Sequence, residues 1–271
     1  MAWLYEAFSN KPIDIDDSYL SEAFDIVINE GANIDNTKAF LAGRKEFKAE
    51  VRAARKALRA KDKDATKKHM KAAKKALDDM ESAIRKTEGT ASSTLCGLFA
   101  YGLLTATTQC IPFGGFFVSV AMSLNFTPKT STGALVGDVG EVIHGVEFKK
   151  FDPSSIHIHV PDFDFEDGAY EVLDELEDAS KNLKDASKAL QKIDRKELML
   201  AIGVDVFAIM AIIQRMIMLA KDIAKLFDEL RHPKTNTADA FNLYRNRLLQ
   251  FCDKLKKEFI QLEEKVNKSF K

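Results

Sequence analysis

Apolar side chains recur at helical spacing along most of this chain. From about Thr37 to Glu88 they fall into two sets, Phe40, Phe47, Val51, Ala54 and Leu58, followed by Met70, Ala73, Leu77, Met80 and Ile84. The pattern fails between the sets at "AKDKDAT", where Asp64 is suited to cap a new helix. We therefore predict that 37–88 is a helical hairpin with a tight turn, and the alternative is one continuous coiled coil.

The clearest pattern lies in the last helical stretch, about 236–270. Its apolar residues step by three or four throughout and predict a packing seam: Phe241, Tyr244, Leu248, Phe251, Leu255, Phe259, Leu262 and Val266. Helical patterning also resumes near Gly168, where Leu173, Leu176, Leu183, Ala186, Leu190 and Ile193 share one face. The region 168–271 is therefore predicted to complete a bundle with 37–128.

Two segments have a different character. Residues 1–36 are acidic and predict two short helices around a turn at Lys11-Pro12, the second ending at Gly31. Within 129–167, the alternating stretches "GEVIHGVEF" and "SSIHIHV" predict short strands. The predicted fold class is mainly α: an elongated helical bundle with antiparallel helical hairpins and a small β-hairpin insertion near 133–165.

Residues 89–128 contain no Asp, Glu, Lys or Arg, although such residues make up 30% of the chain. Pro112 and the pair Gly114-Gly115 lie in the middle of this segment and predict a break into two helices, about 92–109 and 113–126. The segment is therefore interpreted as an apolar hairpin. Its candidate core or membrane residues are Leu95, Leu98, Phe99, Leu103, Leu104, Pro112, Phe113, Phe116, Phe117 and Val120.

Two environments would suit such a hairpin. A bilayer core of roughly 30 Å needs about 20 helical residues, and the two halves would reach only about 25 Å and 21 Å. The hairpin could instead dip into one leaflet and return, or it could lie buried within the protein or an oligomer. The sequence leaves both alternatives open.

A second apolar segment, Leu198 to Ala220, is interrupted by Asp205, Gln214 and Arg215. Ionised groups are costly at the centre of a bilayer. Asp205 and Arg215 are ten residues apart, so they cannot pair within one helix. We predict a central helix of the bundle, with partners for both charges on a neighbouring helix.

The formal net charge is −1, but the charges are segregated along the chain. Residues 1–36 carry −7, 37–88 carry +9, 138–199 carry −8 and 200–271 carry +4. Blocks of opposite sign predict contacts with one another or with neighbouring copies, while a basic face for lipid headgroups is the alternative. Aromatic residues are almost absent from 48–98, so the sequence disfavours nucleic acid as a partner.

Candidate chemistry is sparse, and we expect neither an enzyme nor a cofactor. His157 and His159 share one face of a predicted strand and form a weak candidate metal site, for which an exposed β edge is the alternative. Three cysteines without metal spacing predict buried thiols in a reducing compartment. The start "MAWLYEAFSNKPIDIDD" lacks the features of a secretory signal, which predicts the cytoplasm of the producing cell, a virion or a membrane-associated state.

Two resemblances bear on function. The "LYEAF" start and the Lys/Ala-rich hairpin turning at "AKDKDAT" make residues 1–88 resemble uncharacterised virion structural proteins of large tailed bacteriophages. The layout of long amphipathic helices around an apolar segment resembles that of α-helical pore-forming toxins. The first implies a non-enzymatic structural or assembly protein, acting by helix–helix association with itself or other subunits. The second implies a pore-forming or membrane-perturbing protein that inserts 94–126 into lipid as an apolar tongue.

Overall fold

The computed structural model describes residues 34–87, 93–123, 168–231 and 238–269, and within these ranges it contains helices and no strand. The helices are α3 (Ile34–Arg59), α4 (Lys63–Lys86), α5 (Ser93–Cys110), α6 (Pro112–Ser123), α7 (Gly168–Leu190), α8 (Arg195–Ile202), α9 (Val206–Arg231) and α10 (Ala238–Lys268). The mainly α prediction is confirmed for this part of the chain. The acidic helices predicted within 1–36 lie outside it except for residues 34–36, which begin α3, and the β-hairpin predicted near 133–165 also lies outside it.

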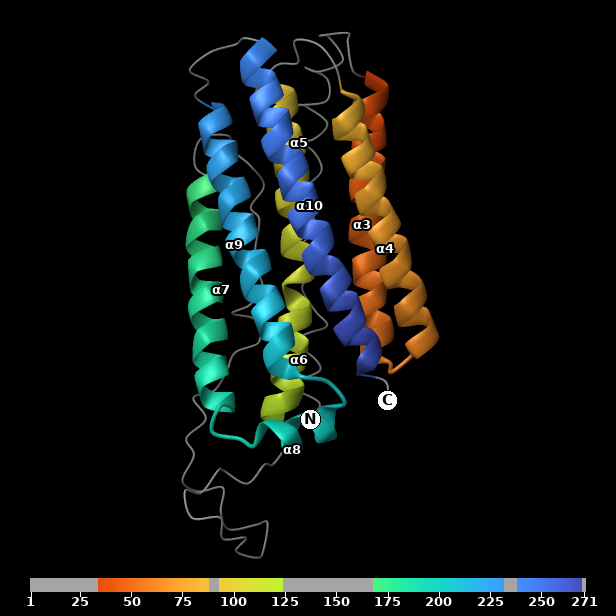
Figure 1. The fold of residues 1–271 in the computed structure, drawn as a ribbon, viewed down its shortest axis with the longest axis vertical. Coiled ribbons are helices and arrows are strands. Elements are labelled where there is room, and N and C mark those ends of the chain that lie inside the picture. Colours follow the sequence, from red (N-terminus) through yellow and green to blue (C-terminus); the bar gives the residue numbers. More distant parts are fainter. Residues whose placement is uncertain (1–33, 88–92, 124–167, 232–237, 270–271) are drawn as a thin grey trace, which may run out of the picture.

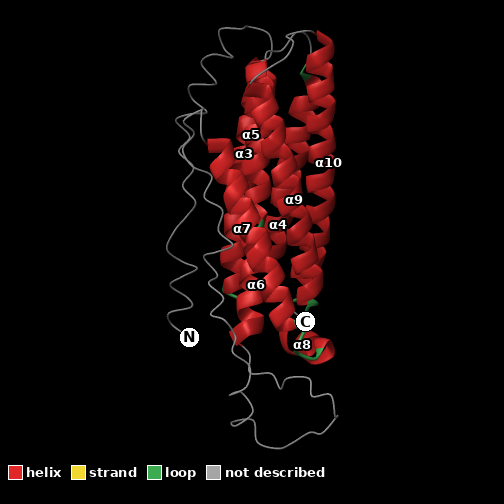
Figure 2. Cartoon of the chain, turned by 90° about the vertical axis from the view of Figure 1, so that its left-hand side faces the viewer, coloured by secondary structure: helices red, strands yellow, loops and turns green. Residues whose placement is uncertain are grey.

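All the long helices run along one axis, and short α8 lies across one end (Figure 1). The α5–α6 segment occupies the interior, because α5 contacts α3, α9 and α10, and α6 continues along α9. Outside this centre, α4 packs on α3 and α10, and α7 packs on α9. Viewed from the side, the same helices form an elongated bundle (Figure 2). Neighbours α3 and α4, α7 and α9, and α9 and α10 run antiparallel.

The α3–α4 hairpin turns within three residues, Ala60 to Asp62, so the continuous coiled coil is wrong. Lys61 takes a left-handed conformation (φ 57°), and Asp62 N–H donates to the Ala57 carbonyl at 3.0 Å, which closes the end of α3. The Asp62 side chain then accepts from Ala65 N–H at 2.9 Å and caps α4. The cap is therefore Asp62 and not Asp64, because Asp64 already lies inside the first turn.

The apolar segment is not a hairpin. Leu95–Met122 forms one helical unit of 28 residues, with α5 and α6 running in the same direction on either side of Ile111. Pro112 occupies the first position of α6. A residue there needs no N–H, because the N–H at this position has no acceptor within its own helix. Gly114 N–H donates to the Ile111 carbonyl at 2.9 Å, so the helical path resumes at once. The glycines that were predicted to break the helix are accommodated inside it.

The second apolar segment is also not one helix, since α8 and α9 meet at an angle of 87°. Gly203 ends α8 in a left-handed conformation (φ 79°). Asp205 precedes α9, pairs with Arg195 of α8 and accepts from Ala208 N–H at 3.3 Å. Arg215 is paired across helices, as its position predicted, and its Nε donates to Glu258 of α10 at 2.8 Å.

The α10 seam lies against the bundle, as its spacing predicted. Phe241, Leu248, Phe251, Leu255, Phe259, Leu262 and Val266 are buried, and Tyr244 is half-buried. Phe259 is fully buried, and its ring packs edge-on against Phe47 of α3 with centroids 5.5 Å apart. The seam therefore ties the last helix to the first described one.

Phe259→Ala should lower the free energy of unfolding by about 3–5 kcal/mol, because it removes a buried ring and leaves a cavity between α10 and α3. Urea unfolding followed by circular dichroism measures the loss. Lys257→Ala, at an exposed position two residues away, is the matched control and should change the free energy by no more than about 0.5 kcal/mol. Equal stability of the two variants would show that α10 is not packed as described.

Candidate functional site

The interior helix α5–α6 is the strongest candidate for a functional element. Of its predicted residues, Leu95, Leu98, Phe99, Leu103, Leu104, Pro112, Phe113 and Phe117 are buried, while Phe116 and Val120 are half-buried. By length and composition Leu95–Met122 could cross a membrane, and the core helix of a soluble protein passes the same test. Helices of the same chain bury this segment, so no second copy of the protein is needed to shield it from water.

Side chains from the surrounding helices interlock with α5–α6. Phe40 of α3 packs edge-on against Phe99 at 4.7 Å and fills the notch at Gly102, where a Cβ atom would lie 2.3 Å from the Phe40 ring. Ile213 of α9 takes the equivalent place at Gly114, 2.8 Å from a built Cβ. The small residues of the segment therefore serve close packing within the bundle.

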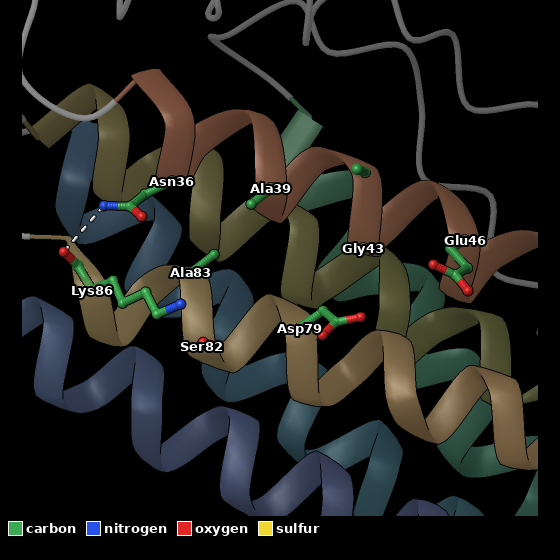
Figure 3. A pocket seen from close by; sticks show the side chains of 9 residues that line it. Asn36, Ala39, Gly43, Glu46, Asp79, Ser82, Ala83 and Lys86 are labelled. Atoms are coloured by element: carbon green, nitrogen blue, oxygen red, sulfur yellow. Dashed lines mark hydrogen bonds between the residues drawn. The ribbon is translucent and has the colours of Figure 1, made fainter.

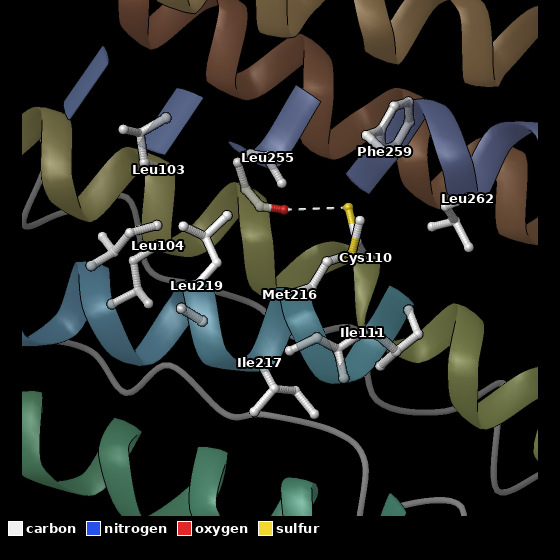
Figure 4. Packing of buried hydrophobic residues seen from close by; sticks show 14 of the residues in the cluster. Leu103, Leu104, Cys110, Ile111, Met216, Ile217, Leu219, Leu255, Phe259 and Leu262 are labelled. Carbon is white, nitrogen blue, oxygen red and sulfur yellow. Dashed lines mark hydrogen bonds between the residues drawn. The ribbon is translucent and has the colours of Figure 1, made fainter. Parts of the chain in front are cut away.

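Two further helices pack on the middle of the α5–α6 helix from different sides (Figure 4). Leu255 and Phe259 of α10 approach Cys110, while Met216 and Leu219 of α9 lie on another side of the same helix. All four are buried. Because α5–α6 has no charged side chain, ion pairs cannot hold it, and apolar contact of this kind is its principal attachment.

Three threonine hydroxyl groups of α5 form hydrogen bonds within the helix itself. Thr105, Thr107 and Thr108 donate to the carbonyls of Gly102, Leu103 and Thr105, at 2.9, 2.8 and 3.0 Å. A helix that satisfies its polar groups internally can enter an apolar environment without losing hydrogen bonds. The threonines therefore place no demand on a protein neighbour.

Ion pairs join the outer helices around α5. Lys256 of α10 lies 2.6 Å from Asp78 and 2.7 Å from Glu81 of α4, and Glu258 of α10 binds Arg215 of α9. Partial burial of Glu81 opposes ionisation, but hydrogen bonds from Lys256 and Arg85 outweigh it and lower the pKa of this carboxyl. These ion pairs connect the outer helices to one another and involve no residue of α5–α6.

One end of the bundle exposes apolar side chains. Leu200 of α8 is 81% exposed and Met199 is 46% exposed, so we call this pair the α8 tip. Asp194 caps α8 by accepting from the N–H groups of Lys196 and Glu197, which fixes the short helix across the end of the bundle. The tip lies at the end where α6 finishes, and α6 contacts α8 (Figure 1).

The sequence pattern placed Met199 and Leu200 inside a buried helix, and the α8 tip was therefore missed. The available signal was the pair Asp194 and Gly203, a cap and a terminator that bracket a helix of eight residues. So short a helix across the end of the bundle leaves adjacent apolar residues in solvent.

A shallow groove of about 300 Å³ runs between α3 and α4 (Figure 3). Ala39, Ala42, Gly43 and Ala83 provide small apolar walls, and Glu46 and Asp79 provide two carboxylates. At its edge, Asn36 Nδ2 donates to the Lys86 carbonyl at 3.1 Å. The Gly43 Cα lies so close to α4 that an added Cβ would be 3.0 Å from Met80, so the groove follows from tight helix packing.

The predicted metal site and the three cysteines are the remaining candidates for chemistry. His157 and His159 lie outside the described ranges, and within those ranges no group of three His, Cys, Asp or Glu side chains is arranged to hold a metal ion. Cys96, Cys110 and Cys252 are buried free thiols, as predicted. Burial raises the pKa of Cys252, which keeps this thiol protonated and unreactive at neutral pH.

Phe99→Asp should fail to give soluble helical protein, because a carboxylate at a 1% exposed position would be buried without a partner against Phe40. The cost of several kcal/mol is comparable with the stability of a whole domain. Soluble yield and circular dichroism measure the effect, and Phe99→Leu is the control that keeps the site apolar. A soluble, normally helical Asp variant would mean that α5 is not held in the interior.

Glu81→Gln should lower the free energy of unfolding at pH 7 by about 1–2 kcal/mol, because Lys256 and Arg85 lose a charged acceptor. The pKa of Glu81 is lowered in the folded state, so its contribution is present above pH 4.5 and disappears as pH falls through the folded pKa. Urea unfolding from pH 7 to pH 3 tests this. Exposed Glu264→Gln is the control. A difference between Glu81→Gln and wild type that does not shrink as the pH falls would refute the role of the ionised pair.

The apolar interior helix, the α8 tip and the α3–α4 groove are thus the features that could carry a function. Their interpretation depends on geometry, because comparisons with protein-family models, curated proteins and solved structures give no match to this chain.

Proposed function

We propose that this chain is a membrane-perturbing protein that keeps α5–α6 covered in water and transfers it into lipid. The observation that carries the proposal is the uncharged helical unit Leu95–Met122. Its 28 residues correspond to about 42 Å, which exceeds the roughly 30 Å of a bilayer core. The two short halves expected from the sequence would not have reached this length.

The attachment of α5–α6 supports such a transfer. Its contacts with α9 and α10 are mainly apolar, while α3 adds the side chain of the buried Arg44 next to Gly102. Lipid chains can replace the apolar contacts at little cost. The internally bonded threonines need no replacement partner in lipid. Ion pairs such as Lys256–Glu81 hold the outer helices together.

The α8 tip supports an initial contact with the membrane. Exposed Met199 and Leu200 can enter the headgroup region without unfolding of the bundle, and Lys192, Arg195 and Lys196 are exposed on the same short segment. Because α6 ends beside α8, a bundle docked through this tip would bring one end of the apolar helix to the lipid surface.

A second candidate is the structural or assembly protein implied by the resemblance to phage virion proteins. The observation that favours it is the interlocked core, in which Phe40 fills the notch at Gly102 and Ile213 fills the one at Gly114. Such packing suits a permanently folded rod that associates through its outer faces. In this function α5–α6 never leaves the interior.

Release of dye from vesicles of mixed zwitterionic and anionic phospholipid tests the membrane function. Wild-type protein should release dye, and Leu200→Glu should weaken vesicle binding about tenfold by placing a charge at the α8 tip. Leu243→Glu is the matched control, since Leu243 is 60% exposed on α10 near the opposite end of the bundle. Both variants should retain the wild-type melting temperature.

The outcomes separate the candidates. Release of dye by wild type and Leu243→Glu, with weakened binding by Leu200→Glu, supports membrane action through the tip. Equal loss in both variants would point to general surface charge and remove the role of the tip. A wild-type protein that forms a defined oligomer in sedimentation without detergent, and neither binds nor permeabilises vesicles, would favour the assembly protein.

A further inference from the structure

Gln109 of α5 is a buried polar side chain without a visible role in the bundle. Its residue surface is 1% exposed, and neither Nε2 nor Oε1 has a hydrogen-bond partner among the parts of the chain that the structure describes. A buried primary amide that forms no hydrogen bond is unfavourable, because it has given up its bonds to water. Gln109 therefore weakens the state in which it is observed.

Gln109 belongs to a narrow stripe of α5 together with Gly102 and Ala106. At 100° per residue, Ala106 and Gln109 lie within about 40° of Gly102 in projection. Gly102 and Ala106 are small residues four positions apart, a spacing that permits close approach of two helices in a membrane. In the bundle, Phe40 and Arg44 of α3 lie against Gly102, so a second helix can reach this part of the stripe only after α3 has moved away.

We infer that the Gly102–Ala106–Gln109 stripe is the surface through which α5 pairs with α5 of a second copy of this chain in lipid. The inference rests on the proposed membrane function and names the partner of the inserted helix. In hydrocarbon a primary amide requires a hydrogen-bonding partner. Two copies of Gln109 related by a twofold axis can each donate an N–H to the other's carbonyl oxygen, which satisfies both.

The neighbouring threonines do not create the same need for a partner. Thr105, Thr107 and Thr108 already donate to carbonyls of their own helix. A second helix that brings a polar group to the Gly102 side can satisfy Gln109 in lipid. The same side chain thus weakens the soluble bundle and favours the paired helix in lipid.

Gln109→Leu tests the inference, because it should move stability and membrane activity in opposite directions. Its melting temperature in water should equal or exceed that of wild type, since an unsatisfied amide is replaced by an apolar side chain of similar size. After incubation with vesicles, amine-reactive cross-linking should capture about tenfold less dimer and higher oligomer, and dye release should fall in parallel. Thr108→Val is the control on another side of α5 and should keep wild-type cross-linking and dye release.

Gln109→Asn supplies a second measurement, since it keeps the amide and should retain more cross-linked product than Gln109→Leu. Wild-type cross-linking and dye release in the Leu variant would overturn the pairing surface and leave the membrane function in place. A wild-type protein that does not bind vesicles would overturn both. A Leu variant that is less stable in water would show that Gln109 contributes to the bundle, which also contradicts the inference.

Discussion

The uncharged α5–α6 helix packs mainly against α3, α9 and α10, and those contacts determine where the remaining helices lie. With no charge to hold it at the surface, the segment must be covered on nearly every side in water. α3, α9 and α10 pack directly on it, and α4 and α7 then cover the outer faces of those three. The elongated shape follows, because the covering helices must be as long as the helix they enclose (Figures 1 and 2).

The charged residues link the outer helices to one another. The pairs Lys256–Glu81 and Arg215–Glu258 link α10 to α4 and to α9, and Lys221–Glu177 links α9 to α7. Such pairs fix which helices are neighbours, although partly exposed pairs contribute little stability. Because these pairs join the outer helices, α5–α6 could leave the interior without breaking any of them. This division between apolar attachment and charged clamping makes a membrane-active bundle physically reasonable.

Gln109 and the α8 tip have one property in common, since neither improves the folded state. Because Leu200 is exposed, its side chain adds no hydrophobic stabilisation to the fold. The Gln109 amide, which lacks a hydrogen bond, lowers the free energy of unfolding. Departures from good packing and good hydrogen bonding tend to occur where another requirement applies. Both departures belong to the same proposed sequence of events, contact with lipid followed by helix pairing within it.

Local patterning was sufficient to predict the amphipathic helices. The steps of three and four from Phe241 to Val266 identified α10, and the two apolar sets on either side of "AKDKDAT" identified the α3–α4 hairpin, because each helix buries one face. Arg215 could be assigned a partner on another helix, since a charge within an apolar stretch must be neutralised. The identity of that partner, Glu258, depends on how α9 and α10 are aligned.

The chain by itself determined that 89–128 must avoid water, because an uncharged segment of that length has no other stable environment. It did not determine the path of the segment. Pro112 and Gly114-Gly115 permit either a turn or a continued helix. In the bundle the helix continues, and Ile213 packs so closely on Gly114 that an added Cβ would lie 2.8 Å from it. The α8–α9 bend and the isolation of Gln109 likewise depend on packing between residues far apart in the chain. Helical periodicity is a local property, whereas the choice between turning and continuing is made by neighbours that only the tertiary structure brings together.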